Sequence, residues 1–411
     1  MVNIYLFTHS FPYTKNSETF LETEMHVISS YSEYNVTVIP LLKSKFKREL
    51  PLNVVLDNKI CEYSFFHRAL IFFRLLLSPI FWSFSKERTN FEFKVLFDWV
   101  KYFYGASLIK QYIYQNRNNI NPDDIFYSYW FSFAPLGFAL AKNYNWFKTN
   151  RCFTRAHGFD VYLADRGVYV PLREFTLNRL EKVFVVSDYG CSFLQDKYPQ
   201  FNHKVTVSRL GVMALSKSKL FKVNSLIKNE FNVVSCSGLS FIKRVPLIFK
   251  SINNYCELNC NIKITWVHIG DGEEKYILKE LISQQKKNNL FVKLTGSITN
   301  EDVKEIYSKN KFHAFINLST TEGVPVSIME AISAGIPILA TDVGGNREIV
   351  TEETGLLLSN GFKQEAFNEK LDFLLINNIA YVRTVTSFFE KNYSAANNYP
   401  AFYENMTKQK M

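Results

Sequence analysis

Residues 312–350 read FHAFINLSTTEGVPVSIMEAISAGIPILATDVGGNREIV, and their apolar and polar runs predict the order strand, loop, helix, strand, loop, helix. Glu322 lies in the first of these loops, and Pro325 suits the first turn of the helix that follows. Glu330 falls inside that helix, eight residues after Glu322. The pattern predicts two carboxylates that face one crevice from different elements.

The helix that follows Glu322 has the properties of a site for a nucleotide sugar. A helix N-terminus offers unpaired N–H groups and a partial positive charge to a diphosphate, and we expect Gly323 and Val324 to supply the N–H groups. Glu322 could accept hydrogen bonds from sugar hydroxyls, and Glu330 could accept a pair from a ribose diol. Two glutamates at this spacing are more often simply solvated, so the spacing alone is not specific.

Short apolar runs alternate with helical patterns along most of the chain, which is typical of βαβ units in a parallel sheet. We expect strands at residues 2–8, 36–42, 125–130, 152–156, 183–187 and 205–210, then at residues 232–237, 264–269, 291–295, 314–318, 336–340 and 355–358. The prediction is an α/β protein with two Rossmann-like doubly wound domains that face a central cleft. The acceptor-side domain is expected at residues 1–215 and the nucleotide-sugar domain at residues 229–381, with a linker between them at residues 216–228. A helical segment at residues 382–411 is expected to cross back to the first domain.

Composition limits the class of protein. A length of 411 residues favours two domains, and a net charge of +10 favours an anionic partner. The six cysteines form no CxxC pair, and the N-terminus lacks the features of a signal peptide, so we expect reduced thiols and a cytoplasmic location at the inner face of the membrane. No helix-turn-helix, zinc-finger or RNA-binding motif occurs, so nucleic acid is not an expected partner.

The stretch at residues 312–350 matches the pattern EGxPxxxxEAxxxGxPxxxxxxGGxxE and resembles the signature of glycosyltransferase family 4, with its E-x7-E element. The resemblance implies the GT-B fold and a retaining transfer of a hexosyl-type sugar from a nucleotide-diphosphate sugar, with UDP or GDP as the nucleotide. The implied acceptor is a glycan or a lipid-linked glycan in the synthesis of lipopolysaccharide, capsule or exopolysaccharide. The nucleotide sugar is a substrate, so no cofactor is expected.

Three shorter segments resemble the family in the expected order along the chain. TRAHGFD at residues 154–160 implies that His157 lies near the donor sugar, and SGLSFIKRV at residues 237–245 implies that Lys243 holds the diphosphate. IGDGEE at residues 269–274 matches the strand-to-helix turn of the family. The implied catalytic residues are Glu322, His157 and Lys243, and the implied donor-binding residues are Lys243, Arg244, Gly270, Asp271, Gly296, Glu322, Gly323, Val324, Pro325, Val326 and Glu330.

The chain departs from the family pattern in two places. Gly238 stands where the family has an arginine, so either Arg244 or another basic residue substitutes for that cation, or diphosphate binding is weaker. The usual glycine pair of the first loop is replaced by Lys15, Asn16 and Ser17. The expected acceptor residues are Thr14, Asn16, Ser17, Tyr129 and Asp160.

Several alternatives stay open. His157 could be a core histidine, Lys243 a solvated lysine and Asp160 a helix cap. The chain contains no D-x-D triplet, so we expect a reaction without a metal, in which Lys243 and helix amides stabilise the leaving diphosphate. The alternative function is an inactive or weakly active nucleotide-sugar-binding partner of the same fold. The aromatic residues between residues 65 and 114 form either the core of two helices or a surface for an anionic membrane.

Overall fold

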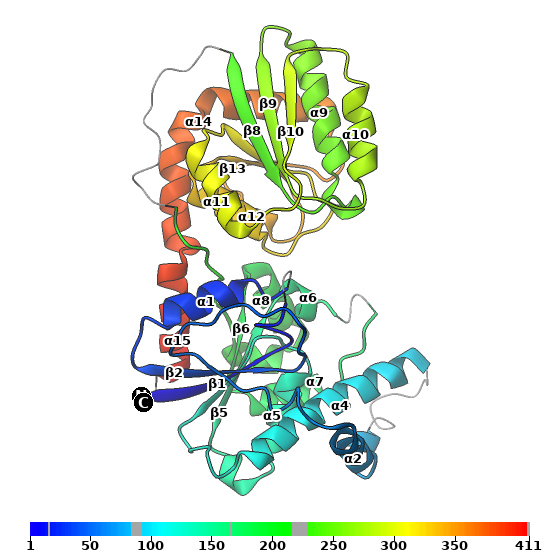
Figure 1. Cartoon of the computed structure of the whole chain (residues 1–411), viewed down its shortest axis with the longest axis vertical. Coiled ribbons are helices and arrows are strands. Elements are labelled where there is room, and N and C mark those ends of the chain that lie inside the picture. Colours follow the sequence, from blue (N-terminus) through cyan, green and yellow to red (C-terminus); the bar gives the residue numbers. More distant parts are fainter. Residues whose placement is uncertain (15–16, 84–92, 164–166, 216–228, 409–411) are drawn as a thin grey trace. The chain divides into compact units, whose positions relative to one another are not determined.

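The structure is a computed structural model that describes residues 1–14, 17–83, 93–163, 167–215 and 229–408. The chain forms two compact units (Figure 1), the first made of Met1–Leu210 with Asn398–Met411 and the second of Gly211–Asn397. Each unit contains one parallel sheet with helices on its faces. The predicted linker at residues 216–228 lies outside the described residues.

The sheet of the first unit has the strand order β3-β2-β1-β4-β5-β6-β7, and all of its neighbouring strands are parallel. From β1 the chain adds β2 and β3 on one side of β1, and it then adds β4 to β7 in order on the other side. The direction in which strands are added therefore reverses between β1 and β4. The strands are β1 (Val2–Thr8), β2 (Tyr34–Pro40), β3 (Val55–Leu56), β4 (Ile125–Ser128), β5 (Arg151–Ala156), β6 (Lys182–Val185) and β7 (Val205–Val207). Only β3 was not predicted, because two residues are too few to show an alternating pattern.

The sheet of the second unit has the order β10-β9-β8-β11-β12-β13 and is also parallel throughout. Its winding reverses between β8 and β11. The strands are β8 (Glu230–Cys236), β9 (Lys263–Ile269), β10 (Leu290–Leu294), β11 (Ala314–Asn317), β12 (Ile338–Thr341) and β13 (Gly355–Leu358). The predicted α/β fold with two doubly wound sheets is therefore confirmed.

Helices cover both faces of each sheet. The first unit contains α1 (Phe20–Ile28), α2 (Phe65–Leu76), α4 (Phe93–Gln115), α5 (Phe133–Ala141), α6 (Gly158–Val161), α7 (Arg173–Arg179), α8 (Asp188–Lys197) and most of α15 (Ala395–Thr407). The second unit contains α9 (Val245–Leu258), α10 (Lys275–Ser283), α11 (Asn300–Lys309), α12 (Val326–Ser333), α13 (Asn346–Ile349) and α14 (Gln364–Asn392). No helix in the described part of the chain is both long and apolar enough to cross a bilayer.

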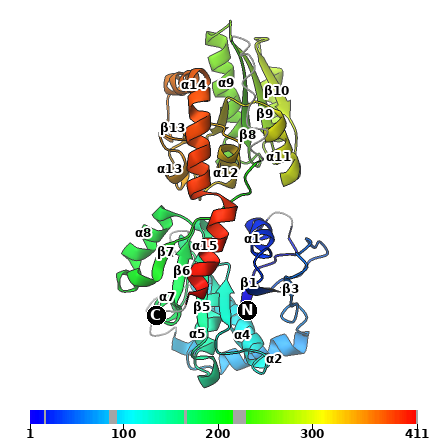
Figure 2. The ribbon, with the colours of Figure 1, turned by 90° about the vertical axis from the view of Figure 1, so that its left-hand side faces the viewer.

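Strand β4 shows how alternating side chains serve two faces of the first sheet. Phe126 packs edge-on against Phe138 of α5, with 6.0 Å between ring centres. Its neighbour Tyr127 points to the other face and lies 5.2 Å from Phe402 of α15. All four residues of β4 are buried, as expected for a strand covered on both sides. Figure 2 shows this second face, with α15 in front of the strands.

The C-terminal helices place the unit boundaries differently from the prediction. Helix α14 is continuous over 29 residues, so the predicted boundary between residues 381 and 382 falls inside it. Val212 then pairs with the end of α14, because its N–H donates to Tyr393 and its carbonyl accepts from Ala395, both at 3.0 Å. The second unit therefore starts at Gly211 rather than after residue 215, and only residues 398–411 belong to the first unit.

Helix α15 covers a buried ion pair in the first unit. Arg155 of β5 and Glu24 of α1 are both fully buried, with 3.5 Å between Nη1 and Oε2. The Tyr403 hydroxyl lies 3.2 Å from Oε1 of Glu24, and the Arg155 guanidinium lies 4.0 Å from the ring centre of Phe402. Phe402 thus shields the pair from water, and its removal would leave a charged group beside a cavity.

We expect Phe402→Ala to lower the free energy of unfolding of the first unit by about 3–5 kcal/mol. The physical reason is the loss of a fully buried ring that contacts Tyr127, Phe184 and Arg155. Urea denaturation measures the change. Phe373→Ala on the exposed side of α14 is the matched control and should change stability by no more than about 0.5 kcal/mol. Equal stability of the two variants would contradict the packing described here.

Candidate functional site

In the second unit, the loops after β8 and β11 meet where the winding of the sheet reverses. Parallel α/β sheets bind ligands beyond the carboxyl ends of their strands at such a reversal. The loop after β8 contains Lys243, and the loop after β11 contains Glu322. The topology therefore brings together two residues that are 79 positions apart in the sequence.

Lys243 and Glu322 form a close ion pair. The Lys243 Nζ donates to both carboxylate oxygens of Glu322, at 2.7 and 2.8 Å. Ser319 Oγ and Asn317 Nδ2 donate to Oε1 of the same carboxylate, at 2.6 and 3.2 Å. The Glu322 side chain is only 7% exposed, whereas Lys243 is 25% exposed. The carboxylate is thus fixed in place, while the ammonium group keeps contact with the surface.

The start of α12 differs slightly from the prediction. Pro325 occupies the N-cap position, with φ −75° and ψ 121°, and the helix begins at Val326. Pro325 therefore precedes the first turn instead of lying in it. Within the described chain, no backbone hydrogen bond is donated by the N–H groups of Gly323, Val324 or Val326. Gly323 and Val324, the donors that the sequence predicted, are thus without a backbone acceptor in the described chain.

Glu330 lies in α12, as predicted, and its side chain is held by a different element. Asn300, at the start of α11, donates a short hydrogen bond from Nδ2 to Oε1 of Glu330. Burial raises the pKa of Glu330, and the bond from Asn300 acts in the opposite direction. Neither Lys243 nor Glu322 hydrogen-bonds Glu330 in the described chain, so the two carboxylates belong to separate hydrogen-bond groups.

Glycines let the loops of the second unit approach one another. Gly344 has φ +49°, and a Cβ atom there would lie 1.9 Å from the Glu322 carbonyl oxygen. Gly270 has φ +139°, and a Cβ atom there would lie 1.9 Å from the Ser237 carbonyl oxygen. Gly270 also donates its N–H to Gly296, at 3.0 Å. The predicted donor-site glycines therefore join neighbouring loops at the carboxyl edge of the sheet.

Arg244 and Asp271 are both engaged by other residues of the second unit. Arg244 donates to the carbonyls of Leu318, Ser319 and Asn360 and to the Asn360 side chain. With Nε and both terminal nitrogens engaged, it is a brace for the loop after β11 and a poor substitute for the cation absent at Gly238. Asp271 is paired with Lys275 at 2.6 Å, and this bond lowers the pKa of Asp271.

In the first unit, His157 is enclosed by aromatic rings. The ring centres of Tyr129 and Trp130 each lie 4.6 Å from that of His157. Neither ring nitrogen of His157 hydrogen-bonds any described residue. Burial, together with the charge of Arg155, holds the pKa of His157 well below its usual range. Burial therefore favours the neutral imidazole, and the surroundings of His157 also fit the alternative interpretation of a core histidine.

Asp160 links two loops of the first unit. One carboxylate oxygen accepts from the His157 N–H and the other from the Phe131 N–H, both at 2.7 Å. Burial raises the pKa of Asp160 to about 7, against the effect of these bonds and of Arg173. Asp160 therefore caps α6, as the alternative interpretation had it, and holds the loops after β4 and β5 together.

Glu18 was missed in the sequence analysis. Its carboxylate accepts from the N–H groups of His9, Ser10 and Phe11, at 2.7 to 2.8 Å, and from Trp130 Nε1 at 2.7 Å. Glu18 thereby joins the loops after β1 and β4, where the winding of the first sheet reverses. The only sequence signal was an acidic residue between a strand and a helix, which is too common to be informative.

Of the remaining predicted acceptor residues, Thr14 and Ser17 contact each other. Thr14 Oγ1 and Ser17 Oγ are 2.9 Å apart, and the Ser17 N–H donates to Thr14 Oγ1 at 3.2 Å. Asn16 lies outside the described residues. Tyr129 is buried against His157, so its ring supports the histidine instead of facing solvent.

Comparisons with known proteins identify a related family. Residues 216–387 match the family described as glycosyl transferases group 1. One relative is the UDP-N-acetylglucosamine--peptide N-acetylglucosaminyltransferase GtfA subunit of Limosilactobacillus reuteri, 33% identical over 55% of this chain and 42% of the relative. The chain therefore spans less than half the length of this relative.

Solved structures share the fold over the whole chain. The lipopolysaccharide outer core galactosyltransferase WaaB has a TM-score of 0.65 and 14% identity, with 98% of each chain covered. Anabaena Alr3699/HepE in complex with UDP has a TM-score of 0.63 and 14% identity, over 99% of this chain and 100% of that one. At such low identity these likenesses establish the fold alone.

We expect Gly344→Ala to lower the free energy of unfolding of the second unit by more than about 1–3 kcal/mol, the usual cost of a left-handed non-glycine residue. The new methyl group would also have to displace the Glu322 carbonyl oxygen, 1.9 Å away. Thermal denaturation measures the loss. Gly361→Ala is the control, because no atom lies within 4 Å of its Cβ position. If Gly344→Ala melted at the same temperature as the wild type, the loops that contain Gly344 and Glu322 would not approach each other as described.

Proposed function

The second unit of this chain matches the glycosyl transferases group 1 family, and the chain as a whole has the two-domain GT-B fold; from this premise we propose that the chain is a retaining glycosyltransferase. It transfers a hexosyl-type sugar from a UDP- or GDP-sugar to a glycan or lipid-linked acceptor. The single observation that carries this proposal is the Lys243–Glu322 pair beside the open amides before α12.

The donor is bound by the second unit. The diphosphate accepts from the N–H groups of Gly323, Val324 and Val326 and is neutralised by Lys243, whose ammonium group is partly exposed. Glu322 is held by three donors and accepts from hydroxyls of the sugar. Binding of a diphosphate turns Lys243 partly away from Glu322, so the carboxylate gains capacity to accept from the sugar.

The reaction is a displacement at the anomeric carbon on the face that the diphosphate leaves. The bond from the anomeric carbon to the diphosphate oxygen breaks as the acceptor oxygen forms its bond to the same carbon. The acceptor proton passes to the departing diphosphate oxygen, so no protein carboxylate forms a covalent intermediate. Lys243 and the helix amides stabilise the charge that develops on the diphosphate, which is electrostatic catalysis of a leaving group.

The same residues support a reaction without a divalent metal. The charge of the leaving group is instead met by Lys243 and backbone amides. No cofactor is part of the proposal.

The acceptor proposed is a cell-surface polysaccharide or its lipid-linked precursor. WaaB, which shares the fold, is named a lipopolysaccharide galactosyltransferase. The GtfA relative is named for a peptide acceptor, so an acceptor panel should contain both classes. In the first unit, the family resemblance assigns His157 to the sugar, and its two ring nitrogens are buried in an aromatic cage without a hydrogen-bond partner in the described chain.

A second candidate is an inactive binding partner of the same fold. It is favoured by Gly238, which removes one of the two expected diphosphate cations, and by Arg244, which is committed to backbone carbonyls. Such a protein would bind the nucleotide without breaking the sugar bond.

We expect Glu322→Ala and Lys243→Ala each to lower the rate of sugar transfer or donor hydrolysis by about 10²–10³, the usual effect of removing one group that stabilises developing charge. A panel of radiolabelled UDP- and GDP-sugars with extracted polysaccharide, lipid and peptide fractions measures the rate.

Lys250→Ala, on the exposed side of α9, is the control and should retain wild-type activity. Addition of EDTA should leave the wild-type rate unchanged. If wild type and both variants were equally inactive while all three bound UDP, the binding-partner function would replace the enzymatic one.

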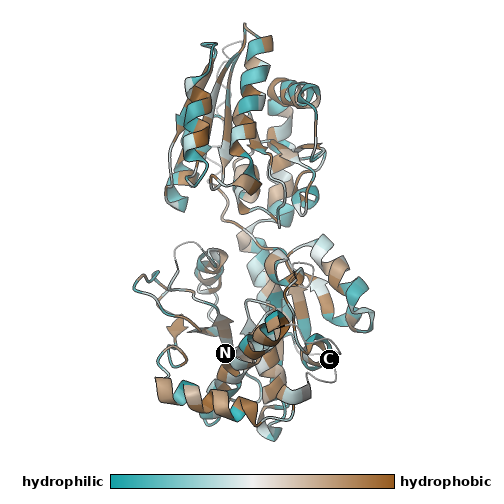
Figure 3. Cartoon of the chain, turned by 90° about the vertical axis from the view of Figure 1, so that its right-hand side faces the viewer, coloured by the Kyte–Doolittle hydropathy of each residue, from teal (hydrophilic) through white to brown (hydrophobic). Residues whose placement is uncertain are grey.

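Helix α2 supports a further part of the proposal, a peripheral contact with an anionic membrane at its cytoplasmic face. Phe66, Leu70, Phe73 and Leu77 are exposed and recur at helical spacing along one side of α2. Figure 3 shows α2 as a largely brown helix at the lower edge of the first unit. In α4, Trp99, Tyr102 and Tyr112 are buried, whereas Phe93 and Phe97 are exposed, so the aromatic residues of α4 are divided between core and surface. Phe91 lies outside the described residues.

We expect the wild type to sediment with phosphatidylglycerol vesicles at low salt and to remain in the supernatant with phosphatidylcholine vesicles. Phe66→Ser with Phe73→Ser should abolish co-sedimentation, because these exposed rings supply most of the apolar contact. Ile376→Ser on α14 is the control for a surface apolar residue. If the wild type stayed in the supernatant when phosphatidylglycerol vesicles were sedimented at low salt, the membrane contact would be refuted.

A further inference from the structure

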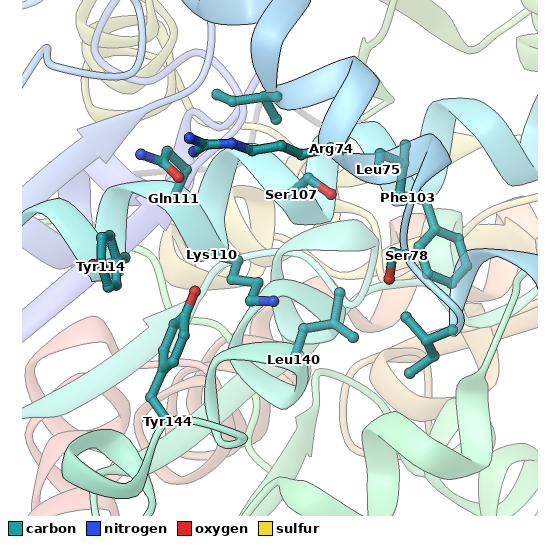
Figure 4. Close-up of a pocket in the computed structure, with 12 residues that line it drawn as sticks. Arg74, Leu75, Ser78, Phe103, Ser107, Lys110, Gln111, Tyr114, Leu140 and Tyr144 are labelled. Carbon is teal, nitrogen blue, oxygen red and sulfur yellow. The ribbon is translucent and has the colours of Figure 1, made fainter.

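The first unit contains a second concave site, outside the loops described above. A cavity of about 330 Å³ lies between α2, α4 and the segment that follows α5 (Figure 4). Its residues are Ile71, Arg74, Leu75, Ser78, Ile80, Phe103, Ser107, Lys110, Gln111, Tyr114, Leu140 and Tyr144. Leu140 and Tyr144 precede β5, whereas His157 and Asp160 follow it, so the cavity is at the amino edge of the sheet. It is therefore separate from the loops that carry His157.

The cavity contains two cations and no acid. Arg74 of α2 and Lys110 of α4 line it, and none of its residues is Asp or Glu. Neither side chain forms an ion pair or a hydrogen bond with any residue that the structure describes, and Lys110 contacts the Tyr144 ring, 5.3 Å from its centre. Burial lowers the pKa of Lys110 and is the only cause of that shift. A partly buried ammonium without an anion is unfavourable, and a bound anion would compensate it.

The polar side chains approach the cavity from two helices. Figure 4 shows Arg74 extending from α2 toward Gln111, while Lys110 extends from α4 toward Leu140. Ser107 also lies on α4, about one helical turn before Lys110 and Gln111. The hydroxyl of Ser107 and the amide of Gln111 also form no hydrogen bond with the described part of the chain, so four polar side chains are available to one ligand.

We propose that this cavity binds the phosphoryl group of a small phosphate ester through Arg74 and Lys110. Arginine and lysine together with neutral hydrogen-bond donors are the groups that recognise phosphate oxygens in proteins. The floor, with Leu75, Phe103 and Leu140, is apolar, and the cavity exceeds the size of a bare phosphate. The ligand is thus an ester whose organic part lies on this floor and beside the Tyr144 ring. It is either a soluble phosphate ester or the head group of an anionic lipid.

The test measures binding of three probes to the full chain: inorganic phosphate and glycerol 3-phosphate by calorimetry, and phosphatidylglycerol vesicles by sedimentation. Saturating UDP is present in each, so that binding at the proposed donor site does not contribute. We expect Arg74→Gln with Lys110→Gln to raise the dissociation constant for glycerol 3-phosphate or for the vesicles about tenfold or more, because two charge-assisted contacts are lost. Lys110→Met alone, which keeps the aliphatic stem, should show part of the loss.

Lys47→Gln with Lys101→Gln removes the same charge from exposed positions and is the matched control. A specific loss for glycerol 3-phosphate identifies a soluble ester, and a specific loss for vesicles alone identifies a lipid head group. Equal binding of all probes by wild type and the Arg74/Lys110 variant, or an equal loss in the control pair, would overturn the proposal. These outcomes do not depend on sugar transfer, because the readout is binding and not turnover.

Discussion

The reversal of winding in each parallel sheet is the constraint on which the rest of this structure depends. Where the winding changes direction, two adjacent strands send their loops to opposite faces and leave an opening at the carboxyl edge. In the second unit this opening is spanned by the Lys243–Glu322 pair, and in the first unit by the bond from Trp130 to Glu18. In both units a glutamate joins the two loops that border the opening.

The two glutamates differ in what remains available to a ligand. Glu18 accepts from three backbone N–H groups and an indole, so its oxygens are consumed in shaping the loop after β1. Three side-chain donors hold Glu322, and one of them is a partly exposed lysine that an anionic ligand can recruit. The first glutamate is therefore a structural element of its loop, and the second is the centre of the proposed donor site.

Buried polar groups without hydrogen-bond partners occur in several parts of the described chain, so they do not by themselves mark a functional site. Neither nitrogen of His157 has a hydrogen bond in the described chain, and Lys110 lies in a cavity without an acid. The Arg155–Glu24 pair is also buried, and Phe402 and Tyr403 of α15 cover it, so this pair fastens the C-terminal helix to the first unit. Lys110 differs from this pair because it lines a cavity, whereas the pair is enclosed by side chains.

The sequence by itself determined the α/β class, twelve of the thirteen strands in the described part of the chain, and the place of Glu322 in the loop before a helix. These features were accessible because each depends on periodicity or on a contiguous motif, both of which are local properties. Only the tertiary structure decided that Glu18 bonds Trp130, that Arg244 braces a loop, that Asp160 caps α6, and that the second unit begins at Gly211. Most of these features depend on contacts between segments that are far apart in the chain. The others depend on which of several possible hydrogen-bond partners the fold brings next to the side chain. The physical reason is that the direction and burial of a polar side chain are set by packing, which a linear pattern does not encode.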